Sequence, residues 1–122
     1  MTETELAWAA GIIDGEGCFH GREVKGKRHA YYWAITFSIT QKYPEILYRF
    51  QAALGVGVVN GPYTYDGYTH YSYRVTGYKK VRALAKAVWP YMSIHKKRQA
   101  NEVFRKYKAG PTRGSTARAQ GA

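Results

Sequence analysis

One ten-residue segment limits the folds open to this chain more than any other. In Tyr31–Thr40, "YYWAITFSIT", aromatic and large apolar residues alternate with small or polar ones. Successive side chains of a β-strand point to opposite faces of the sheet, so the alternation predicts a strand with one apolar and one small, polar face. We therefore expect a sheet that is covered by packing on one side and free to contact a partner on the other.

Apolar residues at helical spacing are found on both sides of this strand. Thr2 and Glu5 have the spacing of a capping box, and an apolar stripe follows as far as Ile13. Pro44 suits the first turn of a helix, and Gly55 suits a C-terminal cap. Four helices are expected, from Thr2 to Ile13, from Pro44 to Leu54, from Val81 to Val88 and from Ser93 to Tyr107.

Two hairpins complete the pattern. One joins Cys18–Val24 to Tyr31–Thr40 through a turn at Lys25–Lys27, and the other spans Val56–Thr76 with its turn at Asp66–Gly67. The resulting order is α-β-β-α-β-β-α-α. It predicts an α+β fold in which a four-stranded antiparallel sheet carries its helices on one face.

The ends of the chain and its cysteine add three expectations. The domain is expected to span residues 1–108, and Ala109–Ala122, which has no large apolar residue, is expected to be a disordered tail. Met1–Thr4 does not resemble a signal peptide. The single cysteine, Cys18, excludes an intramolecular disulfide and a Cys-rich zinc site, so a reducing intracellular environment is expected. Cys18 itself is expected to be a small buried residue.

The charge of the chain predicts a polyanionic partner. Its 122 residues include 19 Lys+Arg against 8 Asp+Glu, a net charge of +11. An anionic membrane surface is the rival partner, but no segment pairs a basic face with a wide apolar face, and no run is long enough to span a bilayer. The 12 tyrosines fit either a sheet that meets its partner or the ordinary preference of tyrosine for strands.

The first helix carries an unusual ending. In "LAWAAGIIDGEGCF", Leu6–Phe19, an apolar segment runs into two acids, Asp14 and Glu16. Trp8 and Ile12 form a second apolar side, so this helix requires packing partners on both sides. Taken alone, Glu16 is an ordinary acid at a helix end, and the run "HKKR" at His95–Arg98 is a solvated face.

Four segments, in order along the chain, resemble one family. "AAGIIDGEG" (Ala9–Gly17) resembles the signature of the LAGLIDADG homing endonucleases, with Glu16 at its final acid. "FSITQK" (Phe37–Lys42), "LGVGVV" (Leu54–Val59) and "HKKRQAN" (His95–Asn101) resemble later segments of the family. The resemblance implies the homing-endonuclease fold and an intron-encoded, site-specific DNA endonuclease. Because the motif occurs once, it implies an active homodimer.

The same resemblance implies an active site. Glu16 and the carbonyl of Gly15 would bind a divalent cation, Mg²⁺, while Gln41 would organise water and Lys96 would stabilise charge at the scissile phosphate. Asp14 is interpreted as structural rather than catalytic. The helix is expected to pack on its copy in the partner through Ala7, Trp8, Ala10, Gly11 and Asp14.

One position departs from the family pattern. The family often has a basic residue one turn after the glutamine, where this chain has the acid Glu45. Either Lys42 or Arg49 covers that role, or the site is weakened.

The polar face of the sheet is expected to lie in the major groove of DNA. Arg22 and Arg74 would each read a guanine, and Asn60 an adenine. Further base contacts are expected from His20, Tyr32, Thr36, Ser38, His70 and Ser72. Phosphate contacts are expected from Lys25, Lys27 and Arg28, and from Lys79, Lys80, Lys97 and Arg98. A homodimer implies a long, roughly palindromic DNA site.

Three alternatives remain open at this point. The first is a splicing maturase, which assists folding of its host intron, and the second is a catalytically inactive DNA-binding regulator on the same fold. The third is an unrelated small basic ribosome-associated or RNA-binding protein, which leaves the two acids at the helix exit unexplained. The sequence does not distinguish an organelle, a phage-infected cell or a prokaryote as the host.

Overall fold

The computed structural model describes residues 2–28 and 30–112. Its elements are α1 (Glu3–Glu16), β1 (Gly17–Lys25), β2 (Tyr31–Gln41), α2 (Pro44–Leu54), β3 (Val58–Tyr65), β4 (Tyr68–Thr76), α3 (Tyr78–Val88), the 3-10 turn η1 (Trp89–Tyr91) and α4 (Ile94–Ala109). This order confirms the predicted α-β-β-α-β-β-α-α arrangement. The 3-10 turn after α3 was not expected.

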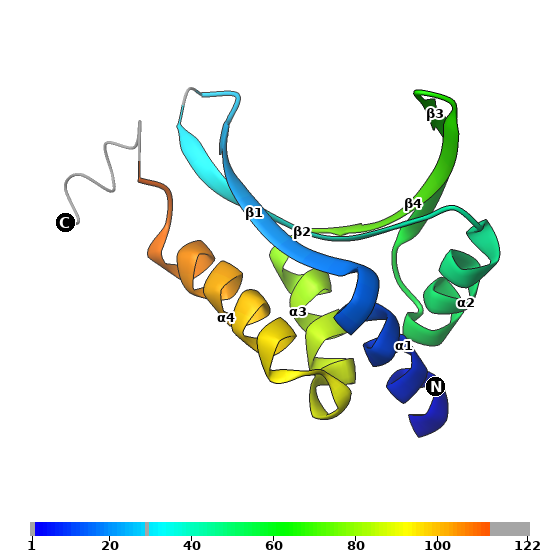
Figure 1. The fold of residues 1–122 in the computed structure, drawn as a ribbon. Helices are drawn as coiled ribbons and strands as arrows, with labels where there is room; N and C mark the ends of the chain where they lie inside the picture. The colour runs from blue at the N-terminus through cyan, green and yellow to red at the C-terminus, as the bar shows by residue number, and fades with distance from the viewer. Residues whose placement is uncertain (1, 29, 113–122) are drawn as a thin grey trace.

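The four strands form one antiparallel sheet in the order β1-β2-β4-β3. Figure 1 shows that the sheet is bent, with all four helices on its convex side and the tips of the two hairpins rising on the other. The prediction of an α+β fold with helices on one face is therefore confirmed. We call the side without helices the uncovered face.

The core lies between the sheet and the helices. Phe37 of β2 is fully buried, and its ring stacks on that of Phe50 from α2 with centroids 5.9 Å apart. Phe19 of β1 packs on Phe37 at 4.8 Å, and the hydroxyl of the fully buried Tyr73 donates to the Val56 carbonyl at 2.6 Å. Buried aromatic pairs of this kind stabilise a core beyond the area they bury.

Several local signals in the sequence act as expected. The Thr2 hydroxyl accepts the backbone N–H of Glu5 at 3.1 Å and caps α1. Gly55 ends α2 with φ of 68°. At the tip of the second hairpin, Asp66 and Gly67 have φ of 51° and 81°, the positive values that a two-residue type I′ turn requires.

A bulge interrupts β3. Asn60 pairs with Ser72 but Tyr63 pairs with His70, so Gly61 and Pro62 together lie opposite one residue of β4. A side chain at Gly61, where φ is 128°, would come within 2.8 Å of the Tyr71 ring. A bulge of one residue switches the face to which the following side chains point.

The end of the described chain differs in part from the prediction. Helix α4 includes Ala109, and Thr112 forms hydrogen bonds with the Glu23 carboxylate. The rest of the predicted tail, residues 113–122, lies outside the described residues. Among the helices that the structure describes, none combines the length and the apolar character needed to cross a membrane.

Candidate active site and nucleic-acid interface

Glu16 lies at the junction between α1 and β1. It is the last residue of the helix and is exposed, and the strand begins at the next residue, Gly17. A side chain at Gly17 would come within 2.9 Å of both the Ile13 backbone and the Phe37 ring. The glycine therefore allows an abrupt change from helix to strand, which leaves the Glu16 carboxylate at the rim of the sheet.

Lys96, near the start of α4, reaches the same junction. Its Nζ donates to the Gly17 carbonyl at 2.5 Å and to Gln99 Oε1 at 3.4 Å. An ammonium group has three N–H donors, so capacity remains for a further acceptor. The ammonium is thus held one residue beyond Glu16 by an acceptor whose position is fixed by the backbone.

Gln99 is a member of this cluster that the sequence analysis missed. Its Oε1 also accepts the backbone N–H of Phe19 at 2.9 Å, so it links α4 to β1 as well as to Lys96. The available signal was its position three residues after Lys96, which puts both side chains on one side of a helix.

Gln41 lies at the same end of the sheet. Gly17, the first residue of β1, pairs with Ile39 of β2, and Gln41 is the last residue of β2. The end of β2 is therefore next to the point where α1 exits. The structure thus brings Glu16, Gln41 and Lys96 to one end of the β1–β2 pair from three separate parts of the chain.

Asp14 has a contact within its own chain. Its two carboxylate oxygens accept the backbone N–H of Ser93, the residue that caps α4, at 3.0 and 3.2 Å. This contact fastens the start of α4 to the last turn of α1. It accords with the interpretation of Asp14 as structural.

The residues at the α1 exit fit one half of a site for a hard cation. Glu16 supplies an exposed carboxylate, and the Gly15 carbonyl is in the last turn, where carbonyls lack partners within the helix. Oxygen ligands of this kind suit Mg²⁺. Within residues 2–28 and 30–112, no group of three or more His, Cys, Asp or Glu side chains is arranged to hold a metal ion.

Arg49 does not replace the missing basic residue in its own chain. Its guanidinium pairs with the Glu5 carboxylate at 2.7 Å and lies 3.8 Å from the centre of the Trp8 ring. Glu5 is near the start of α1, about 16 Å along the helix axis from Glu16 at 1.5 Å per residue. Lys42, exposed and next to Gln41, is the remaining candidate.

Three residues of the predicted dimer face lie on the outer surface of α1. Ala7, Gly11 and Asp14 are exposed, and nothing lies within 4 Å of a side-chain carbon added at Gly11. Trp8 is half-buried under Arg49. The inclusion of Ala10 was wrong, because Ala10 is fully buried in the core of its own chain.

The uncovered face carries the residues predicted to read bases. His20 pairs with Thr36 across β1 and β2, Ser38 pairs with Arg74 across β2 and β4, and Ser72 pairs with Asn60 across β4 and β3. Directly paired residues point to the same face. Alternation along the strands puts the rest of the predicted set there as well, namely Arg22, Tyr32 and His70.

Cys18 was expected to be buried but is exposed. It pairs with Ser38, so it lies on the uncovered face two residues beyond Glu16. Alkylation of its thiol would therefore report whether this surface is covered.

His20 is the residue of the uncovered face with a shifted pKa. Partial burial, followed by the positive charges of Arg74 and Arg22, lowers the pKa of His20 below its usual value of 6.5. Its Nε2 lies 3.4 Å from the Ser38 hydroxyl. The imidazole is therefore neutral at pH 7 and presents one donor and one acceptor.

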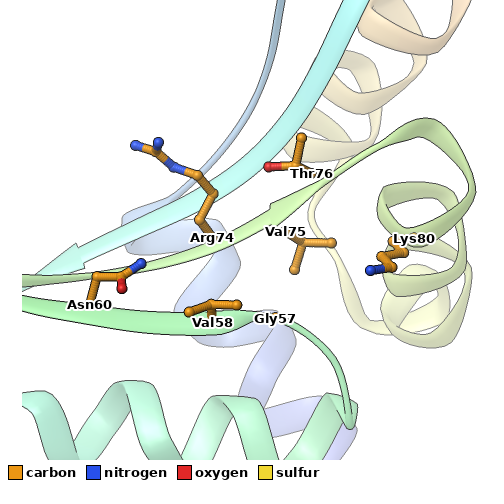
Figure 2. A pocket seen from close by; sticks show the side chains of 7 residues that line it. All are labelled: Gly57, Val58, Asn60, Arg74, Val75, Thr76 and Lys80. Carbon is orange, nitrogen blue, oxygen red and sulfur yellow. The ribbon is translucent and has the colours of Figure 1, made fainter.

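A hollow of about 410 Å³ lies where β3 begins and β4 ends. Figure 2 shows Arg74 and Thr76 on one side of β4 and Val75 on the other, with Lys80 approaching from α3. Lys80 and Arg74 both line this hollow, which suits an anionic group. The other predicted phosphate contacts are exposed at the tip of the first hairpin (Lys25, Lys27 and Arg28) and on α3 and α4 (Lys79 and Arg98), while Lys97 lies 5.8 Å from the Trp89 ring.

The bent sheet with helices on one side and an acid at the exit of its first helix is the homing-endonuclease fold. A profile of the LAGLIDADG endonuclease family matches residues 9–108. The match covers most of the chain, and the protein belongs to this family. A search of curated proteins found no match.

Solved structures of homing endonucleases share this fold. The homing endonuclease I-CvuI, in complex with DNA, has 25% sequence identity and a TM-score of 0.73, covering 88% of this chain and 68% of that one. The archaeal intron-encoded homing endonuclease I-Vdi141I, also complexed with DNA, has 23% identity and a TM-score of 0.73, covering 88% and 69%. The homing endonuclease I-TnaI has 22% identity and a TM-score of 0.68, covering 85% and 71%.

Proposed function

We propose that the protein is a site-specific DNA endonuclease. It acts as a homodimer that cleaves both strands of a long, pseudo-palindromic duplex by metal-dependent hydrolysis. The observation that carries this proposal is the placement of Glu16, Gln41 and Lys96 at one end of a sheet whose uncovered face bears Arg22 and Arg74. Among the similar structures, I-CvuI was solved with uncleaved DNA in the presence of Mg and with its own target in the presence of Ca.

The proposed cation site needs two chains. A single chain offers one carboxylate, Glu16, at the α1 exit. The exposed Ala7 and Gly11 allow a second α1 to approach closely, and that contact would bring the two Glu16 side chains together. Two adjacent carboxylates repel each other unless cations lie between them, so dimer formation and cation binding support each other.

Each of these residues has a proposed chemical role. A bound divalent cation would activate water and stabilise charge on the phosphate and the leaving oxygen. Glu16 and the Gly15 carbonyl hold that cation, with Mg²⁺ as the proposed ion. Gln41 orients water with its side-chain amide. Lys96, fixed by the Gly17 carbonyl at 2.5 Å and by Gln99, directs its remaining N–H donor to the scissile phosphate.

The test separates cleavage from binding. The wild-type protein is incubated with a randomised-site duplex library, with Mg²⁺ and then with EDTA, and the cut sites are sequenced. Glu16→Gln is expected to keep DNA binding and to lose double-strand cleavage. The control is Glu3→Gln, which removes an exposed acid from the other end of the same helix and is expected to cleave normally. Cleavage by Glu16→Gln at the wild-type rate contradicts the site assignment.

One observation favours a second candidate, a DNA-binding regulator without nuclease activity. Glu45 is an acid where the family often has a base, and Arg49 is held by Glu5 in its own chain. The same library distinguishes the two, because a regulator selects a duplex and leaves it uncut at every Mg²⁺ concentration. A maturase would instead promote splicing of its host intron, with Glu16→Gln as active as wild type.

A further inference from the structure

The two hairpins of the sheet differ in charge. Residues 17–41, which form the first hairpin, contain four basic side chains and one acid. Residues 58–76, which form the second, contain Arg74 and Asp66 alone, so their charges cancel. The two tips rise on opposite sides of the uncovered face and would contact different parts of a ligand lying across it (Figure 1).

The second hairpin carries tyrosines on the uncovered face. Before the bulge, Asn60 and Ser72 are paired and point to this face. After the bulge, Tyr63 pairs with His70 and Tyr65 pairs with Tyr68. Since Tyr68 and His70 precede Ser72 at two-residue steps along β4, these tyrosines also point to the uncovered face. We call Tyr63, Tyr65 and Tyr68 the tyrosine strip.

The extra residue of the bulge turns the side chains of Tyr63 and Tyr65 to the uncovered face. Without it, Tyr63 would share the face of Val59, which packs against the core. The rings are instead open to solvent, with 47% of Tyr63, 78% of Tyr65 and 76% of Tyr68 exposed. The centre of the Tyr63 ring also lies 5.6 Å from that of His70, its partner on β4. Clustered exposed aromatic rings are typical of a binding surface.

We infer that the tyrosine strip contacts duplex DNA by apolar packing on thymine methyl groups, so that the outer part of this hairpin, beyond the bulge, reads its bases without charge. The inference rests on the proposed function, and the strip continues the surface formed by Ser72 and Arg74. The thymine methyl is the one apolar group that base edges present in the major groove. A neutral aromatic strip fits that group, whereas the basic tip with Lys25 and Lys27 fits phosphates.

The first measurement is the salt dependence of binding to a duplex selected by the wild-type protein from a randomised library. Tyr63→Thr/Tyr65→Thr/Tyr68→Thr keeps residues that favour strands and is expected to bind at least about tenfold more weakly, with an unchanged slope of log affinity against log salt. Lys25→Ala/Lys27→Ala is expected to reduce that slope by roughly 0.9 for each phosphate that is no longer neutralised. Tyr65→Thr alone repeats the test with the most exposed ring of the strip. Because that ring is 78% exposed, its loss is expected to leave folding unchanged.

The second measurement tests two parts of the contact. It asks whether the tyrosine rings or their hydroxyl groups bind the DNA, and whether the thymine methyl groups are what they bind. Tyr63→Phe/Tyr65→Phe/Tyr68→Phe is expected to bind like wild type. Replacing thymine by uracil in the selected duplex is expected to weaken binding of wild type but not of the threonine variant. The inference is overturned if the threonine variants bind like wild type, if the phenylalanine variant loses as much as the threonine variant, or if uracil has no effect. Absence of duplex binding by wild type would instead refute the proposed function.

Discussion

The exit of helix α1 and the uncovered face of the sheet lie next to each other but are built in different ways. At the exit, hydrogen bonds join Asp14 to Ser93, Lys96 to Gly17 and Gln99 to Phe19, each across 79 or 80 residues of chain. In the part of the chain that the structure describes, the predicted base-contacting residues have one side-chain hydrogen bond, between His20 and Ser38, which are 18 residues apart. Reacting groups must be held within a fraction of an ångström, whereas groups that read bases can adjust.

The largest effect is expected at the fixed exit. Lys96→Ala removes the ammonium held by Gly17 and is expected to slow cleavage by about 10²-fold, in the range for one missing charge-stabilising donor. DNA binding is expected to change far less. The measurement is single-turnover cleavage of the selected duplex. Lys108→Ala, which removes an exposed charge from the last turn of the same helix, is the control, and an equal loss in that variant would show that only net charge matters.

A backbone change tests whether the second hairpin depends on its bulge. Gly61→Ala places a side chain 2.8 Å from the Tyr71 ring at a φ of 128°, so unfolding should require about 1–3 kcal/mol less free energy. Urea unfolding measures this, with the exposed Thr64→Ala as the matched change beyond the bulge. If both variants are equally stable, the conformation of the bulge does not require glycine at position 61.

A smaller loss is expected from the link between α4 and β1. Gln99→Ala leaves the Phe19 N–H without its partner, and the free energy of unfolding should fall by about 1 kcal/mol. Cleavage should also slow, because Lys96 keeps only one of its two acceptors. Asn101→Ala, at an exposed position of the same helix, should change neither quantity. Normal cleavage by Gln99→Ala would show that Gly17 alone positions Lys96.

The smallest effect concerns pH. The pKa of His20 is lowered in the folded protein, chiefly by burial, so the unfolded chain binds the proton more readily. The contribution of His20 to the free energy of unfolding is therefore complete above pH 6.5 and is lost as the pH falls below that value. Between about pH 7.5 and about pH 5.5, the urea midpoint of wild type should therefore fall more than that of His20→Gln. Equal falls would show that this histidine is not shifted. Glu5 and Glu102 do not contribute to this difference. Their lowered pKa values affect stability only below pH 4.5, outside this range.

The sequence predicts the fold well because its signals are local. Alternation in β2, the cap at Thr2, the left-handed Gly55 and the turn at Asp66–Gly67 each act over a few residues. The apolar faces of the strands then decide which side the helices cover.

The parts that sequence analysis missed depend on tertiary contacts. Ala10 and Gly11 are adjacent, small and on one helix, and only packing shows that Ala10 is buried while Gly11 is exposed. Arg49 is held by Glu5, 44 residues away. The direction of Tyr63 and Tyr65 depends on a bulge that no alternation pattern in β3 reveals.

The number of chains on one DNA site tests the account most directly, because the proposed chemistry needs Glu16 from two copies. Light scattering on Glu16→Gln bound to the selected duplex would give that number without cleavage. We predict two chains for each duplex, with Cys18 of both protected from alkylation. A single chain bound with full affinity, or free access to Cys18 in the complex, would contradict a homodimer centred on the exit of α1.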